Sequence, residues 1–287
     1  MMIAKGQQRF FSTGDTAAPK RLKAIYQPKG RALEYSAWAL NLYKGCTHGC
    51  FYCYGPGAAY RSESEYFGDP RELKDVLKNI ESDRNVLRDS GRPGPVLLSF
   101  LSDPYQPVEM ETGLTRSVIK LLKEAGIKIN ILSKGGRRAT RDFDLLGPDD
   151  WAGTTLTFSD DEQSRTEEPQ AGIPSERLRY LRTAKENGIN TWASIEPVVD
   201  PVQAVDLIKR SLPFTDHFKI GKLNFDTMRH GERRERVRKI HDAIDWTAFL
   251  REAIGILEEA GFSRTRTPGE YNGRDYYIKQ DTVKFLP

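Results

Sequence analysis

Three cysteines within eight residues constrain this chain more than any other feature. Cys46, Cys50 and Cys53 are the only cysteines among its 287 residues. An odd number of cysteines cannot build a disulfide framework, and the thiols of a protein in a reducing compartment stay free. The spacing of three residues and then two places three sulfur atoms on one loop. We therefore expect this loop to bind a metal ion or a metal cluster.

Two kinds of metal site are compatible with this loop. Cysteine thiolates hold iron–sulfur clusters, and a four-iron cube bound by only three of them leaves one iron open to an exogenous amino-carboxylate. Zinc is the alternative, with His48 completing a Cys₃His set. His48 lies only two residues from a cysteine on either side. Zinc ligands usually come as two separated pairs, and this difference favours the cluster.

Strand-like and helix-like segments alternate along the chain after residue 35. Such alternation is typical of βα units with a parallel sheet, and right-handed crossovers would curl six units into an α/β, partial (βα)6 TIM-like barrel. The predicted strands are residues 40–44, 96–102, 127–133, 154–158, 189–196 and 217–223. The predicted helices are residues 73–80, 114–125, 141–146, 176–187, 202–212 and 247–260.

The chain divides into three parts by pattern. Residues 1–35 predict an extended N-terminal arm, residues 36–230 the partial barrel, and residues 231–287 a C-terminal α/β extension with one helix and a short strand at 276–279. No apolar run approaches the ~18 residues of a membrane span, and the first residues lack the apolar core of a secretory signal. We therefore expect a cytoplasmic protein without a membrane segment.

Charge is unevenly distributed. Residues 1–31 hold seven basic side chains and one acidic one, a net charge of +6, and residues 229–241 hold six Lys or Arg against two Glu. Basic clusters can bind phosphates, although solvated arms and helix faces explain them more simply. The acidic segment 160–168 carries five carboxylates, and we expect it to be a solvated loop between a strand and a helix.

The cysteine loop and several strand ends together resemble a known family. The segment NLYKGCTHGCFYCY, residues 41–54, resembles the signature loop of the radical S-adenosylmethionine (SAM) superfamily, and more narrowly the spore photoproduct lyase-like (DNA repair photolyase-like) group. The resemblance covers about residues 29–225 and the strand at 276–279. The further segments that carry it are SDPYQPVE (102–109), LSK (132–134), TLT (155–157) with EP (168–169), SIEP (194–197) and IGKLN (220–224).

The resemblance implies a radical SAM enzyme. It places a [4Fe–4S] cluster on Cys46, Cys50 and Cys53, with its fourth iron bound by the amino and carboxylate groups of S-adenosylmethionine. One electron then cleaves the sulfonium, and the resulting 5′-deoxyadenosyl radical abstracts hydrogen from a substrate. Such an enzyme needs a one-electron donor such as flavodoxin or ferredoxin, while the protein positions the cofactor and excludes water.

Sites of parallel α/β proteins form at the carboxyl ends of the strands, so polar residues there are candidates for SAM. Lys134 and Ser102 fit the methionyl carboxylate, Thr155 and Thr157 share one strand face and fit the ribose, and Tyr52 fits the adenine. The remaining candidates are Asp103, Glu196 and Asn224. Asp103 and Glu196 fit the amino group of SAM or the substrate, and Asn224 would line the opening of the site. Each candidate has a structural alternative. Lys134 can be a solvated loop lysine, the two threonines can reflect β propensity, Tyr52 can pack within its loop, and Asp103 can cap a helix.

One departure from the family pattern concerns the residue that returns a hydrogen atom to the product radical. Spore photoproduct lyase uses an additional cysteine near the end of its second strand, whereas residues 99–103 here read SFLSD. Thymine-dimer reversal by a thiyl route is therefore not expected, and Tyr54 or Tyr105 is the candidate to relay hydrogen. The alternative function is a nucleic-acid-binding protein with a structural zinc site and basic segments that contact phosphates. The two ideas merge if the basic segments deliver nucleic acid to the radical.

Overall fold

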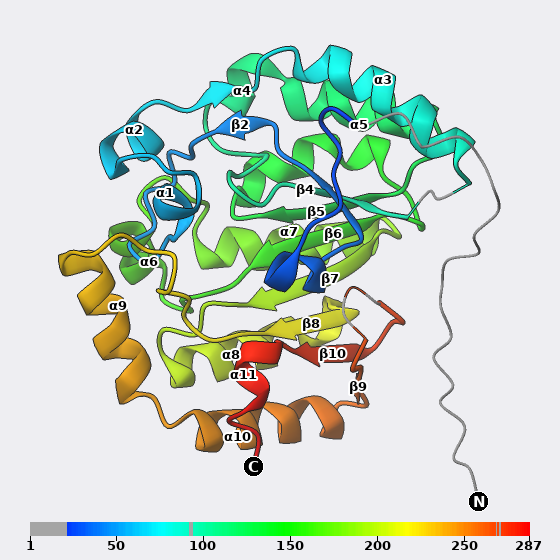
Figure 1. The fold of residues 1–287 in the computed structure, drawn as a ribbon. Helices are drawn as coiled ribbons and strands as arrows, with labels where there is room; N and C mark the ends of the chain where they lie inside the picture. Colours follow the sequence, from blue (N-terminus) through cyan, green and yellow to red (C-terminus); the bar gives the residue numbers. More distant parts are fainter. Residues whose placement is uncertain (1–21, 92–93, 268, 270) are drawn as a thin grey trace, which may run out of the picture.

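A parallel sheet of eight strands forms the centre of the computed structural model, which describes residues 22–91, 94–267, 269 and 271–287 (Figure 1). Its order is β1-β4-β5-β6-β7-β8-β10-β9, and every neighbouring pair is parallel. The strands are β1 (Trp38–Leu40), β4 (Val96–Leu98), β5 (Ile129–Ser133), β6 (Trp151–Thr155), β7 (Asn190–Ile195), β8 (His217–Ile220), β9 (Ser263–Arg264) and β10 (Asp275–Ile278). A separate antiparallel pair joins β2 (Tyr43–Lys44) to β3 (Arg71–Glu72).

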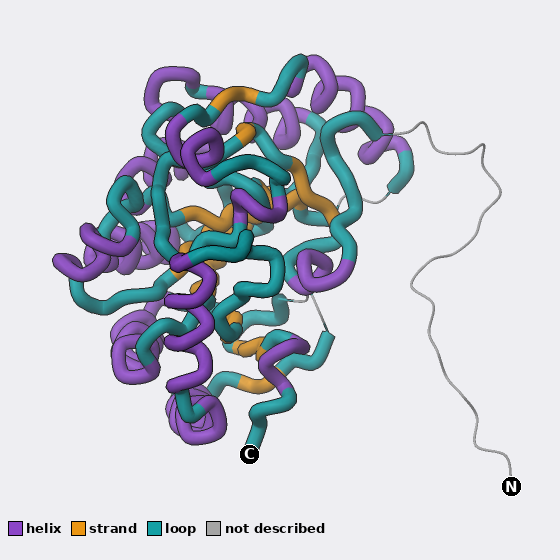
Figure 2. The backbone as a smooth tube through the Cα atoms, turned by 60° about the vertical axis from the view of Figure 1, so that its left-hand side comes forward, coloured by secondary structure: helices purple, strands orange, loops and turns teal. Residues whose placement is uncertain are grey.

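Helices surround this curled sheet, with the strands inside (Figure 2). The α-helices are α1 (Gly55–Ala58), α2 (Glu63–Gly68), α3 (Val76–Asp89), α4 (Glu109–Thr112), α5 (Leu114–Glu124), α6 (Asp161–Glu167), α7 (Pro174–Glu186), α8 (Pro201–Ser211), α9 (Glu232–Ala243), α10 (Trp246–Glu259) and α11 (Gln280–Val283). The 3-10 segments are η1 (Gly30–Glu34), η2 (Gly136–Leu145) and η3 (Leu212–Phe214). The sheet is open, and the α/β partial barrel with parallel strands is confirmed.

Helix α5 shows how the apolar pattern builds the outer layer. Its buried side chains Leu114, Val118 and Leu122 recur four residues apart, so they share one helix face. The chain leaves the helix through Gly126, whose φ of +71° suits a residue without a Cβ. It then enters β5, and the βα unit closes over a continuous apolar core.

The first predicted strand is wrong in its extent. Residues 40–44 do not form one strand, because β1 ends at Leu40 and β2 pairs elsewhere with β3. Asn41 lies at the break, where its side-chain oxygen accepts the N–H groups of Phe100 and Leu101 at 3.0 Å each. The same contact shortens the second strand, which ends at Leu98. A side chain thus takes the place of ladder hydrogen bonds.

The fourth strand lies earlier than predicted, over Trp151–Thr155 rather than 154–158. Its register pairs Gly153 with Trp192 of β7. A Cβ on Gly153 would meet the Trp192 indole at 2.1 Å, so the strand needs a glycine at this position. A glycine within a strand weakens the apolar pattern on which the sequence prediction rests.

The acidic segment 160–168 is a helix and not a loop. Asp160 caps α6, since its side chain accepts the N–H of Gln163 at 2.7 Å. The segment ends at Glu168, which is buried and not solvated. An acidic N-terminus complements the helix dipole, so the carboxylates that suggested a loop favour the start of this helix.

Only part of the predicted N-terminal arm falls on described residues, and that part packs against the protein. Asp83 of α3, itself buried, accepts the backbone N–H groups of Lys23, Ala24 and Ile25 at 2.6–2.9 Å. Tyr26 then pairs with the outer edge of β1. Residues 22–35 of the predicted arm therefore pack against the rest of the protein, while residues 1–21 lie outside the described part.

The C-terminal segment joins the same sheet. β10 pairs with β8 in parallel, with Ile278 opposite Ile220, and α10 packs against α8. This pairing brings Lys279, the residue after β10, to the strand ends where the candidate site lies. Among the described helices, none has the length and apolar character needed to cross a membrane.

Candidate active site

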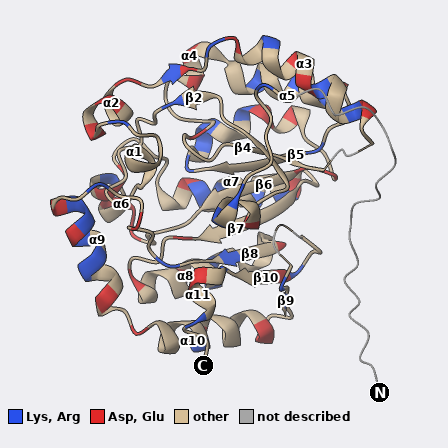
Figure 3. Ribbon diagram, in the orientation of Figure 1, with Lys and Arg blue, Asp and Glu red and all other residues tan. Residues whose placement is uncertain are grey.

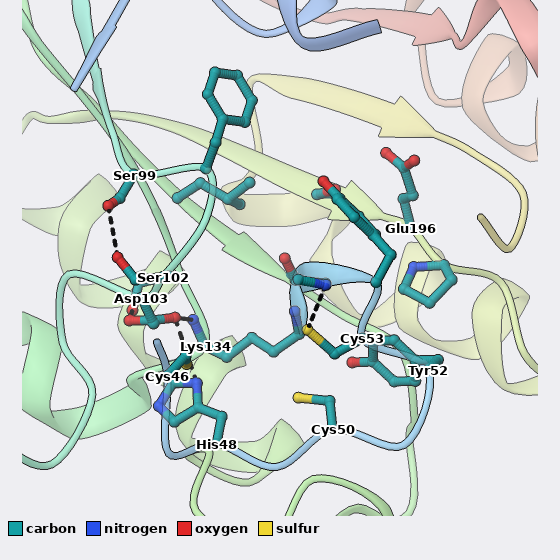
Figure 4. A pocket seen from close by; sticks show the side chains of 18 of the residues that line it. Cys46, His48, Cys50, Tyr52, Cys53, Ser99, Ser102, Asp103, Lys134 and Glu196 are labelled. Atoms are coloured by element: carbon teal, nitrogen blue, oxygen red, sulfur yellow. Dashed lines mark hydrogen bonds and ion pairs between the residues drawn. The ribbon is translucent and has the colours of Figure 1, made fainter. Parts of the chain in front are cut away.

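One pocket lies at the carboxyl ends of the strands (Figure 4). It contains about 1010 Å³ of space not filled by atoms, open solvent at its mouth included. The cysteine loop forms one wall, and Glu196 lies across from Ser102 and Asp103. The predicted residues that line it are Cys46, Cys50, Tyr52, Cys53, Tyr54, Ser102, Asp103, Lys134, Thr155, Glu196 and Asn224.

Side chains from distant elements hold the backbone of the cysteine loop. The N–H of Cys46 donates to the carbonyl of Tyr66 at 2.9 Å. Gln106 contacts the loop on both sides of Cys46, because its amide nitrogen donates to the Gly45 carbonyl at 3.3 Å and its oxygen accepts the Thr47 N–H at 3.0 Å. These contacts orient the loop backbone around Cys46, as outer-shell partners do for metal ligands.

The chemistry of the three cysteines fits an iron–sulfur cluster. All three sulfur-bearing side chains line the same pocket, and the N–H of Gly55 donates to Cys53 Sγ at 3.3 Å. Within the described residues, no three His, Cys, Asp or Glu side chains group closely enough to hold one metal ion. A cube does not need such a group, because each of its cysteine ligands binds a different iron.

His48 does not complete a Cys₃His set in this arrangement. Its Nδ1 lies 3.6 Å from Asp103, and its Nε2 lies 3.1 Å from an Arg138 nitrogen. Burial, more than the nearby charges, lowers the pKa of His48 to about 4, so the ring is neutral at pH 7. The ring supports the loop as a packing residue.

Asp103 organises the edge of the site. Its carboxylate accepts the N–H of Tyr105 at 2.8 Å, the hydroxyl of Ser133 at 2.7 Å and the backbone N–H of Lys134 at 2.6 Å. These contacts fix the end of β5 and the start of the chain after it. The Lys134 side chain lies in the pocket, with its Nζ 5.5 Å from the centre of the Tyr52 ring.

A fully buried ion pair supports Tyr52. Its hydroxyl donates to Glu168, and Glu168 pairs with Arg177 at 2.5 Å. Burial alone would raise the pKa of Glu168, but the charges of Arg177 and Lys134 outweigh it and lower that pKa. Arg177 also donates to the backbone carbonyl of Thr155 at 3.1 Å. The pair therefore ties the cysteine loop to the end of β6.

Two sequence candidates lie outside the pocket. Thr157 follows the end of β6 by two residues, and its hydroxyl contacts the Tyr52 hydroxyl at 3.1 Å without lining the cavity. Tyr105 is completely buried beneath Arg141, and its ring does not reach the pocket. Thr157 supports Tyr52, and Tyr105 belongs to the core.

The wall opposite Asp103 carries residues that the sequence analysis did not assign. Tyr35 donates its hydroxyl to Glu196, and Lys279 pairs with the other Glu196 oxygen at 2.9 Å. Tyr35 also lines the pocket, as does the buried Lys222. Tyr35 falls in the predicted arm, and no local signal distinguishes it. The strand end at 279 is the one sequence signal that points to Lys279.

Comparison with known proteins identifies the family. The model of the radical SAM superfamily matches residues 40–210, more than half of the chain. This chain therefore belongs to the radical SAM superfamily. It is an enzyme of this class, and its cofactors are a [4Fe–4S] cluster and S-adenosylmethionine.

Two relatives match different shares of this chain and of their own length. The uncharacterized protein MJ0683 of Methanocaldococcus jannaschii is 27% identical over 195 residues, which are 67% of this chain and 72% of that protein. The uncharacterized protein Mb2609c of Mycobacterium bovis is 28% identical over 185 residues, 60% of this chain and 52% of that protein. This chain thus spans about half the length of the mycobacterial relative.

Two solved structures share the fold. A spore photoproduct lyase variant with bound AdoMet and dinucleoside spore photoproduct has a TM-score of 0.62 at 14% identity, over 90% of this chain and 79% of that one. SuiB of Streptococcus suis bound to S-adenosylmethionine has a TM-score of 0.57 at 11% identity, over 87% of this chain and 52% of that one. At these identities the likeness concerns the fold.

The buried pair makes a testable prediction. Glu168→Gln leaves the Arg177 guanidinium buried without its counter-charge, so the free energy of unfolding should fall by about 3–5 kcal/mol. Glu162→Gln on α6 is the control, because its pair with Arg165 is exposed and worth less than about 1 kcal/mol. Urea denaturation of the two variants measures the difference, and equal stabilities would contradict this role of the pair.

Proposed function

We propose that Cys46, Cys50 and Cys53 hold the cluster and that S-adenosylmethionine binds in the adjoining pocket. The observation that carries this proposal is that the three cysteines and the polar strand ends open into one cavity. When bound, the cluster supplies the electron that cleaves S-adenosylmethionine to methionine and a 5′-deoxyadenosyl radical, which takes hydrogen from the substrate. The chain's own residues bind and orient S-adenosylmethionine and the substrate, and they shield the radical from water.

Individual roles follow from position. The Lys134 ammonium and the Ser102 hydroxyl provide a cation and a donor for the methionyl carboxylate, and Ser102 is oriented by Ser99 at 3.1 Å. Thr155 is the hydroxyl of β6 that lines the pocket, and it suits the ribose. Tyr52 offers a ring wall to the adenine. Asp103 acts by fixing Lys134, because backbone and side-chain donors already occupy its carboxylate.

Glu196 and Asn224 lie on the far wall and are proposed to face the substrate. Lys279 and Tyr35 fix the Glu196 carboxylate, and Arg31 donates to the Asn224 side-chain oxygen at 3.3 Å. Protein contacts therefore orient both side chains, and a preorganised side chain costs less to order on binding.

Cleavage of the cofactor is the first test. Protein reconstituted without oxygen with iron and sulfide should release 5′-deoxyadenosine when given dithionite and S-adenosylmethionine, and Cys50→Ala should lose this activity. Tyr105→Phe is the matched control, because it removes a buried hydroxyl that lies outside the pocket and has no hydrogen-bond partner among the described residues, and it should keep wild-type cleavage. Colourless wild-type protein that holds zinc and no iron would contradict the proposal.

We propose that Tyr54, and not Tyr105, returns hydrogen to the product radical. Tyr54 lines the pocket directly after Cys53, whereas Tyr105 does not reach it. The phenol O–H bond would break and the product C–H bond would form, which leaves a tyrosyl radical on the protein.

The source of this hydrogen is measurable because phenolic protons exchange with solvent. Turnover of a reacting substrate in D₂O should place deuterium in the product, and Tyr54→Phe should abolish that incorporation while cofactor cleavage continues. The mass of the recovered product reports the outcome. Unchanged deuterium incorporation in Tyr54→Phe would exclude this role.

The electron donor and the substrate class complete the proposal. Radical SAM enzymes need an external one-electron donor, and flavodoxin or ferredoxin is proposed here. The proposed substrate is a nucleic acid. Its support is the net charge of +6 over residues 1–31, with Lys23 and Lys29 exposed at the described end of that segment, and the aromatic pocket wall formed by Tyr35 and Phe100.

Binding of a labelled oligonucleotide tests the substrate class. Fluorescence anisotropy should show affinity that falls as salt rises, because cationic side chains release counterions from the phosphates. The double variant Lys23→Glu and Lys29→Glu should bind more weakly and with a smaller salt slope. Arg238→Glu on α9, whose arginine already pairs with Glu235 and Asp242, should bind as the wild type does. Affinity independent of salt would contradict a nucleic-acid substrate.

A further inference from the structure

Helix α9 contacts the cysteine loop, although it falls beyond the residues that match the family. Figure 3 shows the Lys and Arg residues along this helix. Val237 of this helix is completely buried in an apolar cluster with Cys50, Phe51 and Tyr52. Arg236 stacks its guanidinium 4.1 Å from the centre of the Phe51 ring. The basic run that suggested an exposed helix face therefore has an inward side, and that side covers the loop.

Arg233 makes the most direct contact with the loop. Its Nε donates to the carbonyl of Phe51 at 2.7 Å, and its Nη2 donates to the carbonyl of Cys53. Its Nη1 lies 2.5 Å from a carboxylate oxygen of Glu63 on α2. One planar guanidinium thus joins the two carbonyls around the third cysteine to a neighbouring helix, and a lysine ammonium cannot reproduce this fork.

The side chain has no part in the pocket itself. Arg233 does not line the cavity, whereas Lys134 does. Its side chain is 21% exposed, and its guanidinium contacts the loop on the side away from the pocket. Any effect of Arg233 on the site must therefore pass through the loop backbone or through its charge.

We propose that Arg233 is a positioning residue that fixes the Cys53 end of the loop and holds its positive charge, which pairs with Glu63 on the side away from the loop, near the cluster. This inference rests on the proposed function, because it needs the cluster on these cysteines. Reduction makes a cluster more negative, so a fixed positive charge stabilises the reduced form and raises its reduction potential. The hydrogen bonds to the two carbonyls keep the loop in the conformation that presents Cys53 Sγ to the pocket.

Two substitutions at one position separate the two effects. Arg233→Gln removes both the charge and the fork, whereas Arg233→Lys keeps the charge and loses the fork. Arg238→Gln is the matched control on the same helix, since Arg238 is exposed and forms ion pairs with Glu235 and Asp242 of α9. Each protein is first compared with the wild type by circular dichroism and thermal unfolding.

We call the hydrogen bonds from Arg233 to the Phe51 and Cys53 carbonyls the clamp. Amide hydrogen exchange measured in the cluster-free proteins reports on this clamp without the cofactor. Amides of residues 51–55 should exchange about tenfold faster or more in both Arg233 variants, because each lost hydrogen bond involves a charged donor. Loss of iron from the reconstituted proteins to a chelator should be about 10- to 100-fold faster. Arg238→Gln should match the wild type in both measurements.

A redox titration monitored by electron paramagnetic resonance tests the charge. The midpoint potential should become more negative in Arg233→Gln and stay near the wild-type value in Arg233→Lys. Wild-type exchange rates in Arg233→Gln would overturn the clamp, and a wild-type potential would overturn the charge effect. If no variant, wild type included, binds iron, the proposed function fails, while the exchange measurement still decides the clamp.

Discussion

The buried pair between Glu168 and Arg177 is the contact on which the site depends most. Both side chains are removed from solvent, so each charge is tolerable only because the other is present. Glu168 accepts a hydrogen bond from the hydroxyl of Tyr52, and Arg177 donates one to the backbone carbonyl of Thr155. One interaction therefore sets the position of the cysteine loop relative to β6, the strand that ends at Thr155.

Preorganisation extends around the pocket by the same means. Asp103 binds three donors at the end of β5, and Glu196 is held between Tyr35 and Lys279 on the opposite wall. Asp103 and Glu196, which the sequence suggests as ligands of the cofactor, thus use their carboxylates to stabilise the pocket walls. A site that is ordered before its ligands arrive loses less conformational entropy on binding.

The sequence predicted those parts of the molecule whose signals are local. Apolar periodicity located the longer helices α3, α5, α7, α8 and α10 and the central strands, and the cysteine spacing located the loop that lines the pocket. The acidic segment 160–168 is a failure with a local cause, the N-cap at Asp160, but the other failures come from contact between residues far apart in the chain. Asn41 ends one strand by binding the exit of another, and the close approach of Trp192 explains Gly153. Arg233 resembles any exposed helix arginine until its carbonyl partners 180 residues earlier are known.

The contribution of Lys279 to the far wall has a consequence for how the protein matures. A ribosome makes the cysteine loop first, α9 about 180 residues later, and the strand that carries Lys279 later still. The nascent loop emerges with three thiols and without the groups that hold it. Arg233 and Lys279 complete the contacts behind the loop and on the far wall, so these contacts exist only once residue 279 has been made.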